Sequence, residues 1–254
     1  MKSLILVFAA TAALAAQSGA AHPDLSGTWL FSIDLPPVAL KKSVNGAATI
    51  KTIDASGRQA ATEKIAGALP STPAPVYKPE FRAKVKDLLE HESKTDPVFY
   101  CDRPGVPRIG SPRRIIQLPN EFVFLYEDIS GDPYRIIPVG GQHKKDGNPS
   151  YYGDSVAKWE GNTLVVDVVN FVDSTWFGED GFFHSDAMHV TERFWRNGAN
   201  LVYQVTVDDP KVLTAPWTMA PRVVKPSTEG LEESPKCTES DAKLLVNNDH
   251  HGQR

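Results

Sequence analysis

The stretch "MHVTERFWRNGANLVYQVTVDD", residues 188 to 209, carries the strongest fold signal in the chain. Asn197-Gly198 is the dipeptide most typical of a two-residue β-hairpin turn, and apolar and polar residues alternate on both sides of it. A turn at these two residues pairs Glu192 with Tyr203 across the strands. The alternation assigns one face to Met188, Val190, Glu192, Phe194, Leu201, Tyr203, Val205 and Val207. Glu192 is therefore the single charge on a face that should point into the core.

Short segments with the same character fill the chain from residue 115 onward. In "KWEGNTLVV", residues 158 to 166, a Gly161-Asn162 loop predicts a second hairpin whose inward face includes Ser155, Trp159 and Asn170. No crossover helices separate these strands, so a parallel sheet is disfavoured. Residues 79–92 combine a proline at the first turn with apolar residues at helical spacing, which predicts one external helix. We expect a mainly β protein: an antiparallel lipocalin-like barrel or a strongly curved meander, with that helix outside.

The first residues resemble an export signal. Lys2 precedes an apolar run over residues 4–16 and a small-residue region that ends near residue 21. The run is shorter than the roughly 20 residues that span a bilayer. We expect a signal peptide over 1–21, one domain over 22–224 with an irregular covering segment at 36–78, and a polar tail over 225–254. The mature protein should be secreted or periplasmic and not inserted in a membrane.

The formal net charge is −4, which gives no basic surface typical of nucleic-acid binding. The chain has two cysteines, Cys101 and Cys237. Because export favours oxidation, we expect a disulfide between them, the alternative being two unrelated thiols. The oligomeric state is left open by the sequence.

The burial of Glu192 has two interpretations. A carboxylate on an apolar face is disfavoured as a charge unless it is paired, and Tyr203 is its natural neighbour. In a structural role, Glu192 pairs with an arginine such as Arg113 or Arg114 and fixes the register. In a functional role, it is a general acid or base facing a ligand cavity.

The loop "DSTWFGEDGFFHSD", residues 173 to 186, is rich in aromatic residues and glycine. It is predicted either as a lid over a binding site or as a plug that closes one end of the core. With His184 as a second acid or base, the predicted catalytic residues are Glu192, His184 and Tyr203. The predicted substrate-binding residues are Asn170, Trp159, Trp176, Phe183 and Ser155.

Several stretches, "CDRPGVPRIG", "FVFLYED", "GDSVAKWEGNTLVVDVVNF", "HSDAMHVTERF" and "VTVDDPKVLTAPWTM", together resemble a large family of secreted bacterial proteins of unassigned activity. The resemblance covers roughly residues 76–222 and implies no reaction. Members commonly carry Asp-Gly-Arg-x-His where this chain reads "GGQHK", which keeps His143 and lacks the acid and the arginine. Gly27, Thr28 and Trp29 resemble the entry strand of lipocalin-like barrels.

Other patterns predict less. "GDSVA" places Ser155 in a hairpin strand, whereas the nucleophile elbow of serine hydrolases needs a strand, a turn and a helix. His184 and His189 face opposite sides of a straight strand, so no metal is predicted for them with Glu192. Cleavage after residue 21 would make His22 the first residue, and an amino-terminal histidine can bind copper, although this is the weakest of the predictions. The chain has no phosphate-binding glycine loop, and no cofactor is predicted.

The sequence thus predicts a small-molecule-binding protein, acting as a cofactor-independent lyase, isomerase or hydrolase on a small, largely apolar or aromatic molecule. The alternative is a non-catalytic carrier of a hydrophobic ligand. A third possibility is a structural module whose packed interior has no cavity.

Overall fold

The computed structural model describes residues 22–30, 48–53, 59–65, 72–128 and 130–238. The predicted signal peptide, most of the covering segment at 36–78 and the last part of the tail lie outside these residues. Within them, no helix is long and apolar enough to cross a membrane.

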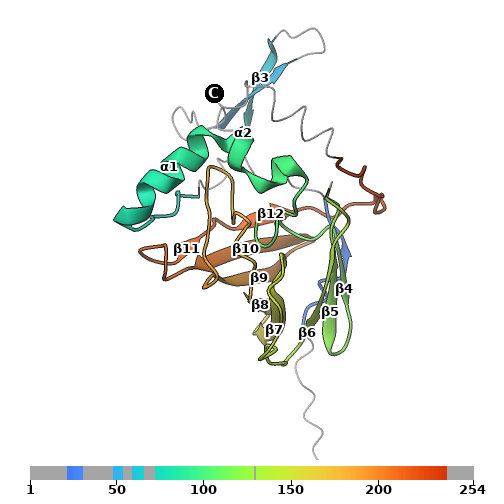
Figure 1. Cartoon of the computed structure of the whole chain (residues 1–254). Helices are drawn as coiled ribbons and strands as arrows, with labels where there is room; N and C mark the ends of the chain where they lie inside the picture. Colours follow the sequence, from blue (N-terminus) through green and yellow to red (C-terminus); the bar gives the residue numbers. More distant parts are fainter. Residues whose placement is uncertain (1–21, 31–47, 54–58, 66–71, 129, 239–254) are drawn as a thin grey trace, which may run out of the picture.

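Two antiparallel sheets face each other (Figure 1). The first has the order β1-β4-β5-β6, with β1 Gly27–Thr28, β4 Arg114–Gln117, β5 Glu121–Leu125 and β6 Tyr134–Pro138. The second has the order β11-β10-β9-β8-β7, with β7 Asp154–Glu160, β8 Thr163–Val169, β9 His189–Asn197, β10 Asn200–Asp208 and β11 Trp217–Thr218. Strand β12, Arg222–Val224, also pairs with β10, and β2 Ala48–Ile53 and β3 Gln59–Ile65 form a separate hairpin.

The two sheets meet at both edges through isolated bridges. A parallel bridge joins Val139, after β6, to Ala157 on β7. On the other side Trp29 bridges Pro226, and the Leu30 amide donates to the Lys225 carbonyl at 2.8 Å. These contacts are not continuous ladders. The mainly β, antiparallel fold is confirmed, whereas a closed lipocalin-like barrel is not.

The predicted external helix is present. A 3₁₀ turn, η2 Pro79–Phe81, leads into α1 Arg82–Glu90, and α2 Glu92–Thr95 and η3 Pro97–Tyr100 follow as short turns. No residue of α1 is fully buried, but Val85 and Leu88 pack against the core. The helix therefore covers the core from outside, as its single apolar stripe predicts.

The two hairpins differ in how well their registers were predicted. Strands β7 and β8 pair as expected, with Glu160 opposite Thr163. In β9–β10, Asn197 pairs with Asn200, so the loop residues are Gly198 and Ala199 and not Asn197 and Gly198.

Consequently Glu192 lies opposite Val205, and the predicted pairing of Glu192 with Tyr203 is wrong by two residues. The physical reason is the turn: Gly198 has φ +61° and occupies the first loop position, as in a type II′ turn. Moving a turn by one residue changes the pairing by two, so each side chain keeps its face. The eight residues predicted to face inward are all buried.

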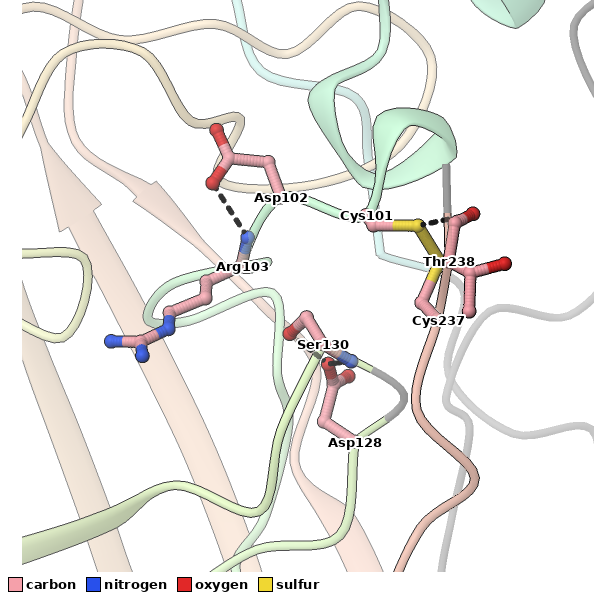
Figure 2. The surroundings of a disulfide bond; sticks show 7 residues. All are labelled: Cys101, Asp102, Arg103, Asp128, Ser130, Cys237 and Thr238. Carbon is pink, nitrogen blue, oxygen red and sulfur yellow. Dashed lines mark hydrogen bonds between the residues drawn. A yellow bond between two sulfur atoms is a disulfide. The ribbon is translucent and has the colours of Figure 1, made fainter. Parts of the chain in front are cut away.

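The predicted disulfide between Cys101 and Cys237 is present (Figure 2). It fastens the tail next to the turn that ends η3. The tail is also held to the first sheet, because the Glu232 amide donates to Glu127 Oε1 at 2.8 Å and the Ser234 amide to Asp132 Oδ2 at 3.2 Å. Thus the C-terminal segment up to residue 238 is attached to the domain at several points.

Candidate functional site

Glu192 lies between the two sheets and is fully buried. Its Oε2 is 2.7 Å from Nη2 of Arg135 on β6, and Tyr203 donates its hydroxyl to Oε1 at 3.2 Å. The structural interpretation named Arg113 and Arg114 as examples of an arginine that could pair with Glu192, and neither of them does. Arg113 pairs with Glu127 at 2.7 Å, and Arg114 is exposed. A buried ion pair thus links β9 of one sheet to β6 of the other.

Arg135 is the centre of a polar core, which we define as Tyr126, Arg135, Ser155, Glu192 and Tyr203. Arg135 donates from Nη1 to the Tyr126 hydroxyl at 3.0 Å and from Nη2 to Ser155 Oγ at 2.8 Å. Burial opposes the charge of Arg135, but Glu192 and Tyr126 together outweigh this and raise the pKa of the guanidinium. Burial also raises the pKa of Tyr126 and Tyr203. The core therefore holds one fixed cation and neutral hydroxyl groups.

Two buried atoms of this core, Arg135 Nε and Glu192 Oε2, make no hydrogen bond within the described part of the chain. The same holds for the buried hydroxyl of Tyr152, a side chain that interacts electrostatically with Tyr126 of the core. Oε2 has the ion pair with Arg135, but that contact lacks hydrogen-bond geometry. Burial raises the pKa of Tyr152, with smaller contributions from charged groups and from the neighbouring Tyr126. A neutral donor and acceptor is thus buried here without a partner.

His184 lies elsewhere and is satisfied locally. It is buried, with Nε2 2.8 Å from Thr175 Oγ1 and Nδ1 2.9 Å from the Ser185 carbonyl. Burial lowers the pKa of this imidazole, so it is neutral near pH 7. Neither contact reaches Glu192 or Tyr203, which places the predicted catalytic histidine in a different network.

The aromatic loop 173–186 packs into the fold. Trp176 and Phe183 are buried and bridge one another. Phe183 stacks on Tyr77 with ring centroids 5.2 Å apart, and the Tyr77 hydroxyl donates to the Phe183 carbonyl at 2.6 Å. A side chain at Gly181 would meet Leu88 of α1 at 2.9 Å. These contacts favour the plug interpretation over the lid.

The remaining predicted binding residues lie apart from one another. Ser155 belongs to the polar core and lies within β7, so the nucleophile-elbow geometry is not formed. Asn170 has φ +65° and donates from its side chain to the Gly147 carbonyl at 2.7 Å. Trp159 stacks on His22 with centroids 4.4 Å apart. Of the predicted site residues, the structure brings Glu192, Tyr203 and Ser155 together.

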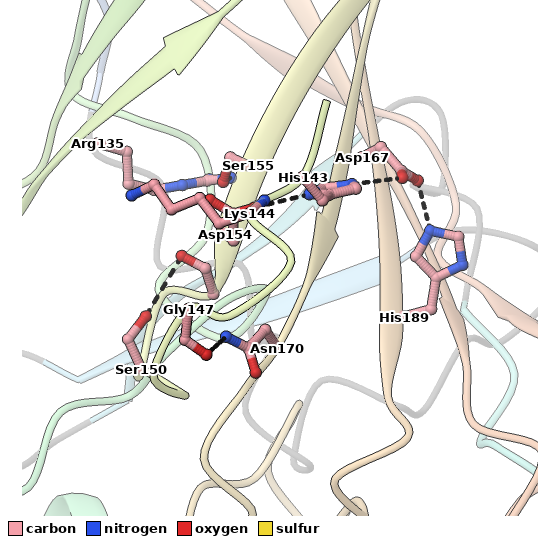
Figure 3. A network of polar contacts seen from close by, with 11 residues as sticks. Arg135, His143, Lys144, Gly147, Ser150, Asp154, Ser155, Asp167, Asn170 and His189 are labelled. Carbon is pink, nitrogen blue, oxygen red and sulfur yellow. Dashed lines mark hydrogen bonds and ion pairs between the residues drawn. The ribbon is translucent and has the colours of Figure 1, made fainter. Parts of the chain in front are cut away.

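A second polar cluster lies on the outer face of the second sheet (Figure 3). His143 has Nδ1 3.0 Å from Asp154 Oδ2 and Nε2 2.8 Å from Asp167 Oδ2, and His189 Nε2 contacts the other oxygen of Asp167. Partial burial opposes protonation of His143, but the two carboxylates outweigh it and raise its pKa. The four side chains come from separate sequence motifs. In the described ranges, no group of three or more potential ligands is arranged to hold a metal ion.

A surface hollow of about 250 Å³ lies at the far end of the first sheet. Its lining comes from the β5–β6 connection and the tail and includes Tyr126, Tyr134 and Leu231. None of the site residues predicted from the sequence lines it. Tyr126 is the one member of the polar core that it reaches.

No protein-family model, curated protein or solved structure matches this chain. The resemblance to a family of secreted bacterial proteins therefore stays a prediction. The function is therefore inferred from the arrangement of the side chains, above all those of the polar core.

Proposed function

We propose that this protein binds a small molecule between its two sheets, at the polar core. The observation that carries the proposal is the set of unpaired atoms at Arg135 Nε and the Tyr152 hydroxyl. A buried polar atom without a partner costs about 1–3 kcal/mol, so each such atom in a native structure calls for an explanation. A ligand that accepts a hydrogen bond from Arg135 and exchanges one with Tyr152 offsets both costs.

The surroundings favour a molecule with a polar tip and a compact apolar body. Phe194 stacks on Tyr203 with centroids 4.9 Å apart and meets Phe124 edge-on at 5.1 Å. Aromatic walls around a few polar groups are the usual composition of a small-molecule site. This agrees with the largely apolar or aromatic ligand expected from the sequence.

The ion pair favours a carrier over an acid–base enzyme. Arg135, 2.7 Å from Oε2, and the Tyr203 hydroxyl on Oε1 hold the Glu192 carboxylate in a contact between the sheets, as expected of a group that fixes the fold and not of one that acts on a substrate. The second candidate, a lyase, isomerase or hydrolase, would use Glu192 as a base or hydrogen-bond acceptor. The enzyme candidate is supported by Glu192 Oε2, which accepts no hydrogen bond within the described residues and so could accept one from a substrate.

We also propose that the protein works outside the cytoplasm, in the periplasm or the medium. The disulfide supports this, because disulfides persist in oxidising compartments.

The test of binding uses Tyr152→Phe, which removes only the unpaired hydroxyl. Native mass spectrometry of the purified protein, mixed with a small-molecule extract of the source's periplasm and medium, should reveal a bound compound. The variant should be as stable as the wild type or more so, since its hydroxyl has no partner to lose. It should nevertheless bind about tenfold more weakly, as expected for the loss of one hydrogen bond to the ligand.

Tyr77→Phe is the matched control, because its hydroxyl donates to the Phe183 carbonyl, away from the polar core. It should lower stability and leave binding unchanged. If no compound binds, or if Tyr152→Phe binds as tightly as the wild type, the proposal fails.

Glu192→Gln separates the two candidates once a compound is found. A folded Glu192→Gln protein that binds the compound but no longer converts it would establish the enzyme and exclude the carrier. Where that variant unfolds, Tyr203→Phe serves instead, because it keeps the ion pair and removes only the hydroxyl on Glu192 Oε1.

A further inference from the structure

The outer face of the first sheet is apolar. The residues of β4, β5 and β6 that point away from the core are aligned across the strands, with Ile116 opposite Val123 and Val123 opposite Ile136. Tyr134 and Ile136 are 65% and 55% exposed. The full outward set is Arg114, Ile116, Leu118, Glu121, Val123, Leu125, Tyr134, Ile136 and Pro138.

The second sheet shows what an outer face in water is expected to look like. Its outward positions include Lys158, Glu160, Asp167, Arg193, Gln204 and Asp208, so each of its four long strands carries a charge there. Antiparallel sheets usually alternate between a buried apolar face and a polar face in water. The first sheet departs from this pattern, and a contiguous exposed apolar patch marks an interaction surface.

The two charges on this face stand at opposite ends of it. Arg114 is in the row with Leu125 and Tyr134, whereas Glu121 is in the row with Pro138. Neither side chain takes part in any ion pair formed within the described residues. The patch is thus apolar in the middle, with an unpaired cation at one end and an unpaired anion at the other.

We propose that this face binds a second copy of the chain, in a twofold-symmetric dimer. The twofold axis lies in the plane of the interface and is perpendicular to the strands. It places the first sheet of one copy face to face with the same sheet of the other copy, with the strands running in opposite directions. Arg114 of each copy then approaches Glu121 of the other, and the Ile116, Val123 and Ile136 rows meet in the centre. Such an interface is self-complementary, as twofold dimers require.

The dimer should be weak and reversible. Strands lie about 4.8 Å apart and rise about 3.3 Å per residue, so three short strands cover less than the roughly 800 Å² per partner of standard interfaces. We expect dissociation in the micromolar range. The dimer leaves the polar core unchanged, so it is independent of the proposed function.

The test is sedimentation velocity of the full-length mature protein from about 1 µM to 1 mM. The wild type should pass from monomer to dimer, and Ile136→Lys should stay monomeric. Thr206→Lys, the same kind of change on the outer face of the second sheet, should behave as the wild type. Circular dichroism checks that each variant is folded.

Charge reversal tests the geometry. Arg114→Glu and Glu121→Arg should each weaken dimerisation about tenfold, because each leaves like charges facing across the interface. A 1:1 mixture of the two variants should dimerise again, since each copy then meets its opposite charge. A wild type that stays monomeric up to 1 mM, a dimer that survives Ile136→Lys, or a mixture that does not recover would overturn the proposal.

Discussion

Replacing Arg135 with methionine tests the ion pair between the sheets. The change removes the 2.7 Å contact to Glu192 and the hydrogen bonds to Tyr126 and Ser155. Breaking one side of a buried pair leaves an uncompensated charge and costs about 3–5 kcal/mol. For a chain of this length the melting temperature should fall by roughly 6–20 °C. Urea unfolding followed by tryptophan fluorescence measures the loss.

The double variant Arg135→Met with Glu192→Leu supplies the control. It removes the stranded charge and leaves only the hydroxyls of Tyr126, Ser155 and Tyr203 without partners, which cost about 1 kcal/mol each or less where they can turn elsewhere. We expect it to be at least about 2 kcal/mol more stable than Arg135→Met alone. A double variant no more stable than the single one would refute this reasoning.

Two further predictions concern the surface and the tail. The two carboxylates raise the pKa of His143, so its contribution to stability is present below the unfolded value near 6.5 and is lost as pH rises through the raised pKa. His143→Gln should therefore lower the free energy of unfolding more at pH 5.5 than at pH 8.5, and equal losses in urea titrations at the two pH values would contradict this. Reducing the disulfide, which closes a separation of 136 residues, should cost roughly 4–5 kcal/mol. Chemical denaturation with and without reductant measures it, and an unchanged midpoint would argue that the tail contributes nothing.

The faces of the strands were predictable from the sequence, and the register of β9–β10 was not predicted correctly. Alternation depends only on the period of two, and it placed Glu192 and Tyr203 inside. The pairing depends on which residue occupies the first loop position. Glycine does so in both hairpins, at Gly161 and Gly198, each with φ near +60°. Giving Gly198 that position would have corrected the register.

The partner of Glu192 was missed because it comes from the other sheet. No local pattern links β6 to β9, and the sequence offered Arg113 and Arg114 only as examples. A signal was nevertheless present: in "YRIIP", Arg135 alternates in phase with the buried Ile137. An arginine on the inward face of one strand is the expected ion-pair partner of a glutamate on the inward face of another strand. Barrel closure could not be predicted either, because it depends on contacts between strand ends far apart in the chain.

The bridge between Trp29 and Pro226 has a consequence for how the chain folds. The N-terminal strand joins β4 on one side and the segment after β12 on the other, a separation of nearly two hundred residues. Contacts between such distant segments close a large loop of chain, and proteins rich in them fold slowly. During synthesis, β1 cannot gain its second neighbour until the segment around Pro226 has been made. This contact therefore forms late, and until then the sheet edges that it joins stay open to other chains.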